Sequence, residues 1–131
     1  MIPMARVVAL PLCIGLPVLG CHDAPPTITP DGIGAAQVGS TLAEVRLNLP
    51  AGSHLAEVDT RFMVDLDAVP VISGPDTLYY LGVPAGGTLT DASPIRFAIT
   101  LHEQVRTSEG IGPGVTLKDA VLRCGRATLR Y

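Results

Sequence analysis

The chain has 131 residues, 47% of them hydrophobic, and a formal net charge of −3. This charge argues against nucleic-acid binding, because nucleic-acid-binding proteins need clustered Lys and Arg to displace phosphate counterions. With no Trp, two Phe and three Tyr, the chain must build a small core mainly from Val, Leu, Ile and Ala, and its 14 Gly and 12 Pro predict many turns.

The first twenty residues have the pattern of a secretory signal. One positive charge, Arg6, precedes thirteen uncharged residues from Val7 to Leu19. A membrane-spanning helix needs about 20 apolar residues, and this run is shorter and contains two prolines. We therefore expect residues 1–20 to be a signal peptide that is removed.

The signal segment ends in Val18-Leu19-Gly20-Cys21, which resembles the lipobox of bacterial lipoproteins. The resemblance implies cleavage before Cys21 and acylation of its sulfur, as in a palmitate-bearing membrane anchor. It also implies a location at the cell membrane or outer membrane, facing the periplasm or the exterior. His22 stands where an Asp would suggest inner-membrane retention, which favours the outer membrane. An ordinary export signal, with Cys21 incidental, is the alternative.

Whether a disulfide can form depends on whether Cys21 is acylated. Cys13 lies in the signal, so acylation of Cys21 leaves Cys124 as the remaining thiol, without a disulfide partner. A Cys21–Cys124 bridge would form only if lipidation failed. In its apolar stretch Cys124 is expected to be a small buried hydrophobic residue, and no neighbouring base would make it a nucleophile.

Residues 21–30 are expected to form a tether, because His22 to Pro30 contain three prolines and few large apolar groups. A single small domain is expected to follow at 31–131.

An internal repeat organises this domain. Residues 29–45 (TPDGIGAAQVGSTLAEV) and 107–120 (TSEGIGPGVTLKDA) share Thr-x-acid-Gly-Ile-Gly, a further Gly, and then x-Thr-Leu-x-acid. Chance rarely repeats so specific a string, so we interpret them as copies of one unit, starting near residues 31 and 109. The glycines, which permit a positive φ and tight turns, are Gly32, Gly34, Gly39, Gly110, Gly112 and Gly114.

Each copy predicts a short capped helix. Thr41 stands three residues before Glu44, the spacing of a capping box, and Thr116 and Asp119 repeat it with a shorter acid. Pro50 and Gly125 end these helices. One apolar stripe recurs at helical intervals in each helix, formed by Leu42, Val45 and Leu49 in the first and by Leu117, Ala120 and Cys124 in the second.

Between the copies the pattern changes to the period of two that indicates strands. Arg61–Asp67 alternates through Phe62, Val64 and Leu66; Thr77–Val83 is rich in β-formers; and Ile95–Leu101 presents Ile95, Phe97, Ile99 and Leu101 to the core. Ala68–Ile72 would extend the first strand or pair beside it, with Pro70 favouring a sheet edge. Turn signals lie at 73–75 and 84–87.

These elements predict an α+β fold: a short capped helix packed on a three- to four-stranded antiparallel meander. The second copy of the helix unit looks truncated, because residues 127–131 supply at most one further strand. Either the unit is shortened, or this strand joins the first sheet.

Gly39–Val45 and Gly114–Ala120, behind a lipobox, resemble the SmpA/OmlA-type lipoproteins, which assist outer-membrane barrel assembly. More distantly they resemble the fold group of secreted β-lactamase-inhibitor proteins. The likeness to uncharacterised bacterial lipoproteins with Gly-Ile-Gly repeats is closer. The motif covers under a third of the chain and marks a fold, not an activity.

The candidate chemistry is sparse. His54 and His102 lack a metal-binding spacing, and His102 is expected on the solvent face of its strand. Asp65 and Asp67 would share one strand face, which suits a cation or an acid–base pair but is more often solvated. The glycines do not form a dinucleotide fingerprint, since Gln37 occupies the third position. We expect no catalytic residue, metal or cofactor.

Two function classes follow. The first is a membrane-anchored envelope lipoprotein with a non-enzymatic, protein-binding or scaffolding role, whose partner contacts Tyr79 and Tyr80 on an exposed sheet face. The alternative is a periplasmic small-ligand-binding or hydrolytic domain that uses Asp65, Asp67 and His102 around a pocket.

Overall fold

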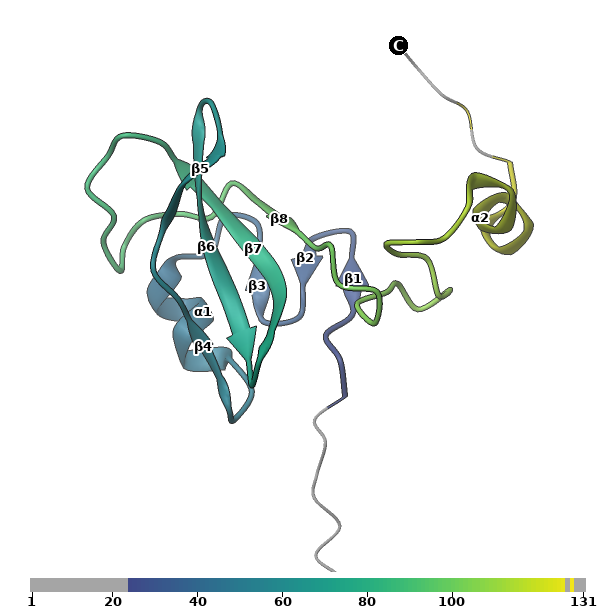
Figure 1. Cartoon of the computed structure of the whole chain (residues 1–131), viewed down its shortest axis with the longest axis horizontal. Coiled ribbons are helices and arrows are strands. Elements are labelled where there is room, and N and C mark those ends of the chain that lie inside the picture. The colour runs from purple at the N-terminus through teal and green to yellow at the C-terminus, as the bar shows by residue number, and fades with distance from the viewer. Residues whose placement is uncertain (1–23, 127, 129–131) are drawn as a thin grey trace, which may run out of the picture.

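The computed structural model describes residues 24–126 and 128. They form two helices and two antiparallel sheets, which confirms the predicted mixture of helix and antiparallel strand (Figure 1). The elements are β1 (Ile28–Thr29), β2 (Gly32–Ile33), β3 (Ala36–Gln37), α1 (Leu42–Asn48), β4 (Ser53–Leu55), β5 (Asp59–Met63), β6 (Leu66–Ser73), β7 (Asp76–Pro84), β8 (Phe97–Ile99) and α2 (Leu117–Cys124). The signal segment lies outside the described residues, and so does the expected strand at 127–131 except for residue 128.

A small sheet of two-residue strands, in the order β1-β2-β3, precedes α1. Sequence analysis did not predict it, because strands this short carry no periodicity. Its first strand falls within the expected tether at 21–30. Thr27 also forms a parallel bridge with Arg106, whose carbonyl accepts a hydrogen bond from the Ile28 amide at 2.9 Å. The chain is therefore built into the fold from Thr27 onward.

The large sheet has the order β4-β6-β7-β8, and β5 pairs with β6 beyond the end of β4. β6 and β7 form its central hairpin around the turn at Gly74 and Pro75, where Gly74 has a φ of +57°. β7 covers the predicted strand at 77–83 and extends it by one residue at each end.

The predicted strand at 61–67 is wrong in one respect, because the chain reverses within it. Met63 pairs with Leu66, so Val64 and Asp65 form the turn between β5 and β6, and Val64 is 97% exposed. Asp65 and Asp67 therefore do not lie on one continuous strand. Alternating hydropathy continues through a two-residue turn, so the pattern alone did not reveal the reversal.

Pro70 lies in β6, which has partners on both sides, and so the expectation of an edge strand is also wrong. On one side Pro70 pairs with Tyr80 of β7. On the other side its carbonyl accepts the Ala56 amide at 2.9 Å, just past the end of β4 and before β5 begins. The missing proline N–H is tolerated because the neighbouring strand is interrupted there.

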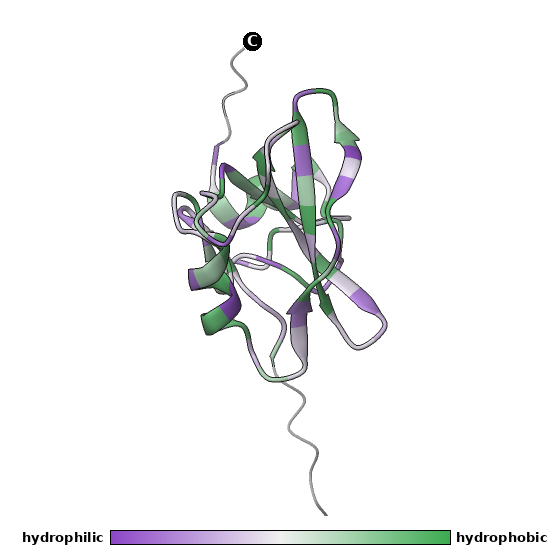
Figure 2. Ribbon diagram, turned by 90° about the vertical axis from the view of Figure 1, so that its left-hand side faces the viewer, coloured by the Kyte–Doolittle hydropathy of each residue, from purple (hydrophilic) through white to green (hydrophobic). Residues whose placement is uncertain are grey.

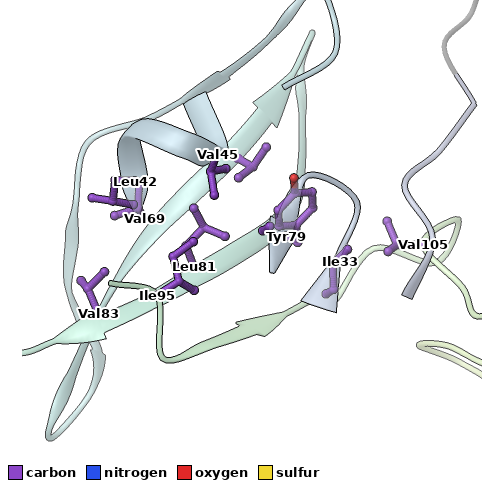
Figure 3. Packing of buried hydrophobic residues seen from close by; sticks show 11 residues of the cluster. Ile33, Leu42, Val45, Val69, Tyr79, Leu81, Val83, Ile95 and Val105 are labelled. Carbon is purple, nitrogen blue, oxygen red and sulfur yellow. The ribbon is translucent and has the colours of Figure 1, made fainter. Parts of the chain in front are cut away.

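α1 contributes its buried residues to the same hydrophobic core as residues of β6 and β7. Thr41 and Glu44 form a capping box at its start, with the Glu44 amide 3.3 Å from the Thr41 hydroxyl oxygen. Leu42 and Val45 are buried, and Leu49 is half-buried against the core. The core residues shown in Figure 3 come from α1, β2, β3, β6, β7 and two loops; the labelled ones are Ile33, Leu42, Val45, Val69, Tyr79, Leu81, Val83, Ile95 and Val105.

The predicted strand at 95–101 is shorter than expected; Ile95 is buried in the core as predicted, but the faces are reversed within β8. β8 contains three residues, in which Ala98 pairs with Leu81 and packs against the core. Phe97 pairs with Gly82, while the Arg96 amide also donates to the Gly82 carbonyl at 2.8 Å. Arg96 and Phe97 are thus both opposite Gly82, which shifts the alternation of inward and outward side chains by one residue. Phe97 and Ile99 consequently lie on the face away from the core.

α2 lies apart from the sheets (Figure 1). Its start repeats the Thr cap, with the Asp119 amide 3.1 Å from the Thr116 hydroxyl oxygen, and Gly125 caps its end. None of its residues is buried, and Leu117 is 60% exposed. The apolar stripe predicted for this helix therefore packs against no sheet. In the part of the chain that the structure describes, no helix is both long and apolar enough to cross a membrane.

Candidate functional site

The side chains proposed for ligand chemistry are separated in the fold. Asp65 lies in the β5–β6 turn and Asp67 at the start of β6, whereas His102 lines a cavity beside Ser73 at the other end of β6. Six residues of strand separate Asp67 from Ser73, which corresponds to about 20 Å. Asp65, Asp67 and His102 therefore do not share one site. Among residues 24–126 and 128, no three His, Cys, Asp or Glu side chains gather as metal ligands would.

The two tyrosines proposed as surface anchors lie on opposite faces of β7. Tyr79 is 2% exposed and belongs to the core, so its ring is not on an open sheet face, and that expectation is wrong. Tyr80 is half-buried and points to the other side. The reason is the period of two in a strand, which cannot place neighbouring residues on one face.

The face of the large sheet away from α1 carries an aromatic cluster. The Phe62 and Tyr80 rings have their centroids 5.0 Å apart at an interplanar angle of 31°. The Phe97 ring lies over Gly82, so closely that a Cβ at Gly82 would overlap it. Ala68, which pairs with Gly82, is completely buried under this layer. We call Phe62, Tyr80 and Phe97 the aromatic face.

Within the described part of the chain, no helix lies over the aromatic face. In Figure 2 α1 lies to the left of the strands, while the right-hand side of the view shows strands and loops only. The three rings remain half-buried, so each keeps part of its surface in contact with solvent. Sequence analysis noted Phe62 and Phe97 but assigned Phe97 to the core. Phe97 pairs with Gly82, and the missing side chain of Gly82 leaves room for the Phe97 ring on this face.

A cavity of about 630 Å³ lies at the opposite end of β6 and β7, near the point where the described chain begins. Its apolar wall includes Pro26, Pro50 and Leu78, and its polar groups include Tyr79, His102 and Gln104. The volume is in the range of small-molecule sites. Sequence analysis did not find this cavity, because the residues that line it come from five separate segments.

The repeated glycines differ between the two copies. Gly34, Gly39, Gly110 and Gly114 have positive φ, as the turn interpretation requires. Gly32 and Gly112 do not, so that interpretation is wrong for them. Their missing side chains matter for space instead, because a Cβ at Gly32 would overlap the Ala36 carbonyl and one at Gly112 would lie 2.5 Å from the Val105 carbonyl oxygen.

Cys124 is exposed, which contradicts its expected burial. It ends α2, whose apolar stripe has no packing partner, and a residue can be buried only where an element covers it. Cys21 and the lipobox lie outside the described residues.

No protein-family model matches the chain, and no curated protein or solved structure is significantly similar to it. The sequence and the geometry therefore carry the functional argument.

Proposed function

We propose that this protein is a membrane-anchored envelope lipoprotein with a non-enzymatic role, and that it binds a protein partner through the aromatic face. The anchor would be a lipid on Cys21, at the cell membrane or outer membrane, with the domain facing the periplasm or exterior. The observation that carries the binding role is the contact between Phe62 and Tyr80 on a sheet face that no helix covers.

Aromatic residues favour this role for physical reasons. They bury a large area while fixing few rotatable bonds, and they are enriched at the centres of protein interfaces. Both phenylalanines of the chain lie on this face, although a core of this size would gain from burying them. A partner that covers the face would bury the remaining exposed part of each ring.

The alternative, a ligand-binding or hydrolytic site built from Asp65, Asp67 and His102, loses support because these groups do not converge. General acid–base chemistry requires the participating groups within hydrogen-bond reach of one substrate.

We also propose that residues 107–124 are a second copy of the glycine turn and capped helix at 29–48, as in the SmpA/OmlA-like resemblance. Gly39 and Gly114 have φ values of +92° and +82°, and each is followed two residues later by the Thr cap. The first helix packs on a meander, whereas the second has no sheet of its own among the described residues.

Fractionation tests the anchor. The wild-type chain should collect in the membrane fraction and incorporate labelled palmitate, whereas residues 22–131 exported behind an ordinary cleavable signal should be soluble and unlabelled. Equal partitioning of the two chains would refute the lipid anchor without bearing on the aromatic face.

Site-specific crosslinking tests the partner. A photoreactive phenylalanine at position 80 should give a discrete crosslinked product in the envelope. The matched control is the same group at Leu47, which is 85% exposed on α1. The product should also disappear with Phe62→Ser, which removes the neighbouring ring. Equal crosslinking from positions 47 and 80 would show that the aromatic face is not selective.

A further inference from the structure

A buried tyrosine, Tyr79, lines the cavity, and no described residue accepts a hydrogen bond from its hydroxyl. Tyr79 is 98% buried, because only 2% of it is exposed, and it lines the cavity. In Figure 3 its oxygen points away from the neighbouring core side chains. Among the residues that the structure describes, none accepts a hydrogen bond from the Tyr79 hydroxyl, although Tyr79 lines the cavity. The hydroxyl can therefore donate to a molecule in the cavity.

The surroundings of this hydroxyl keep it protonated. Burial raises the pKa of Tyr79 to about 12, against a smaller lowering by a backbone hydrogen bond with Ala35. Gly34 lies directly beside this hydroxyl, since a Cβ there would be 3.6 Å from the hydroxyl oxygen, in van der Waals contact.

His102 offers a second donor. Its Nδ1 accepts the Gln104 amide at 3.3 Å, which places the proton of a neutral imidazole on Nε2. The His102 amide in turn donates to the Thr100 hydroxyl at 3.1 Å, and that hydroxyl donates to the Leu78 carbonyl at 2.7 Å. These bonds fix the segment that carries the ring at the cavity wall.

The charge and shape of the walls define the ligand class. Of the residues that the structure describes, Asp76 lines the cavity and no Lys or Arg does, so an anion would be repelled and left unpaired. Pro26, Pro50 and Pro75 supply apolar walls with restricted backbones, so the space is largely preformed. The site suits an apolar body that carries an uncharged hydrogen-bond acceptor.

We propose that this cavity is a binding site for an uncharged amphiphilic molecule, whose carbonyl oxygen accepts the hydrogen bond of the Tyr79 hydroxyl while its apolar part lies against the proline walls. His102 Nε2 is a second donor to the same ligand. The site is distinct from the aromatic face, and the proposal does not require acylation of Cys21.

The probe is 1-octanoylglycerol, which has an apolar chain and an uncharged ester, added to the full chain with Cys21→Ala. Binding is followed by ¹H–¹⁵N NMR. We expect a saturable shift of the Ala35 amide, which adjoins the Tyr79 hydroxyl. Tyr79→Phe removes the phenol donor, leaving His102, and should weaken binding about threefold to tenfold, the effect of one hydrogen bond. Octanoate, which has a similar chain but a negative charge, should bind at least about tenfold more weakly.

Tyr80→Phe is the matched control, because it removes the same atom from the other face of β7 and should leave the affinity unchanged. Failure to saturate, an unchanged affinity with Tyr79→Phe, an equal affinity for octanoate, or an equal loss with Tyr80→Phe would each overturn the proposal. If the Tyr79→Phe variant does not fold, the Ser53→Leu variant tests binding in the cavity instead. Ser53 is a half-buried lining residue, so filling its space must abolish binding while the phenol remains.

Discussion

The two helix units differ most in what their first leucine contacts. Leu42 of α1 is 3% exposed and belongs to the core, whereas the equivalent Leu117 of α2 is 60% exposed. Truncation of a fully buried leucine removes its transfer free energy and leaves a cavity, at a cost of about 2–5 kcal/mol. Leu42→Ala should therefore destabilise the fold by that amount, while Leu117→Ala should change the free energy of unfolding by less than about 0.5 kcal/mol.

The pair controls for helix propensity, since alanine favours a helix at least as well as leucine at both positions. For a domain of about 100 residues, 1 kcal/mol lowers the Tm by about 4–8 °C, so Leu42→Ala should lower it by at least about 8 °C. Urea and thermal unfolding of the Cys21→Ala chain, followed by circular dichroism, measure both variants. If Leu117→Ala costs as much as Leu42→Ala, α2 is packed in solution and the contrast between the two units is refuted.

Four further predictions concern single groups. Hydrogen bonds from the backbone and side chain of Thr41 lower the pKa of Glu44 below 4.5. The cap therefore stabilises the fold at neutral pH, and this contribution is lost as the pH falls below that value. Glu44→Gln should reduce the loss of stability at acidic pH, measured by urea unfolding. Since the pKa of Tyr79 is about 12 when folded, against 10.0 for an unperturbed tyrosine, stability should fall between these pH values, and Tyr79→Phe should remove the slope. Cys124 in a chain of residues 22–131, where it is the one cysteine, should react with a disulfide reagent equally fast with and without urea; slow native reaction would show that it is covered. Gly32→Ala should cost about 1–3 kcal/mol by overlap with backbone, whereas Gly87→Ala, which adds a Cβ in open space, should be close to neutral.

Local hydrogen-bonding signals were the part of the fold that the sequence predicted best. The Thr41-to-Glu44 spacing corresponds to the capping box, and the turn before β7 lies at Gly74 and Pro75. These features depend on residues within four positions of each other, so their geometry is determined locally.

Features that depend on a partner element were not predictable in this way. Whether a stripe such as Leu117 and Cys124 is buried depends on a sheet being present, and the stripe itself is the same in both cases. The faces of β8 depend on its register against Gly82, where one shift exchanges the inner and outer sets. The cavity is beyond sequence reasoning for the same reason, because its walls meet only in the tertiary structure.

Tyr79 and Tyr80 separate the two proposed functions. They are adjacent in sequence, and sequence analysis grouped them as one surface, but strand geometry directs them to opposite faces of β7. Loss of the Tyr79 hydroxyl should weaken the amphiphile and spare crosslinking at the aromatic face, whereas Tyr80→Ala should weaken partner binding and spare the cavity. Effects of residues without shared contacts are expected to be independent. If each variant impaired both functions, the two faces would be coupled through the packing of β7, and neither assay alone could assign a site.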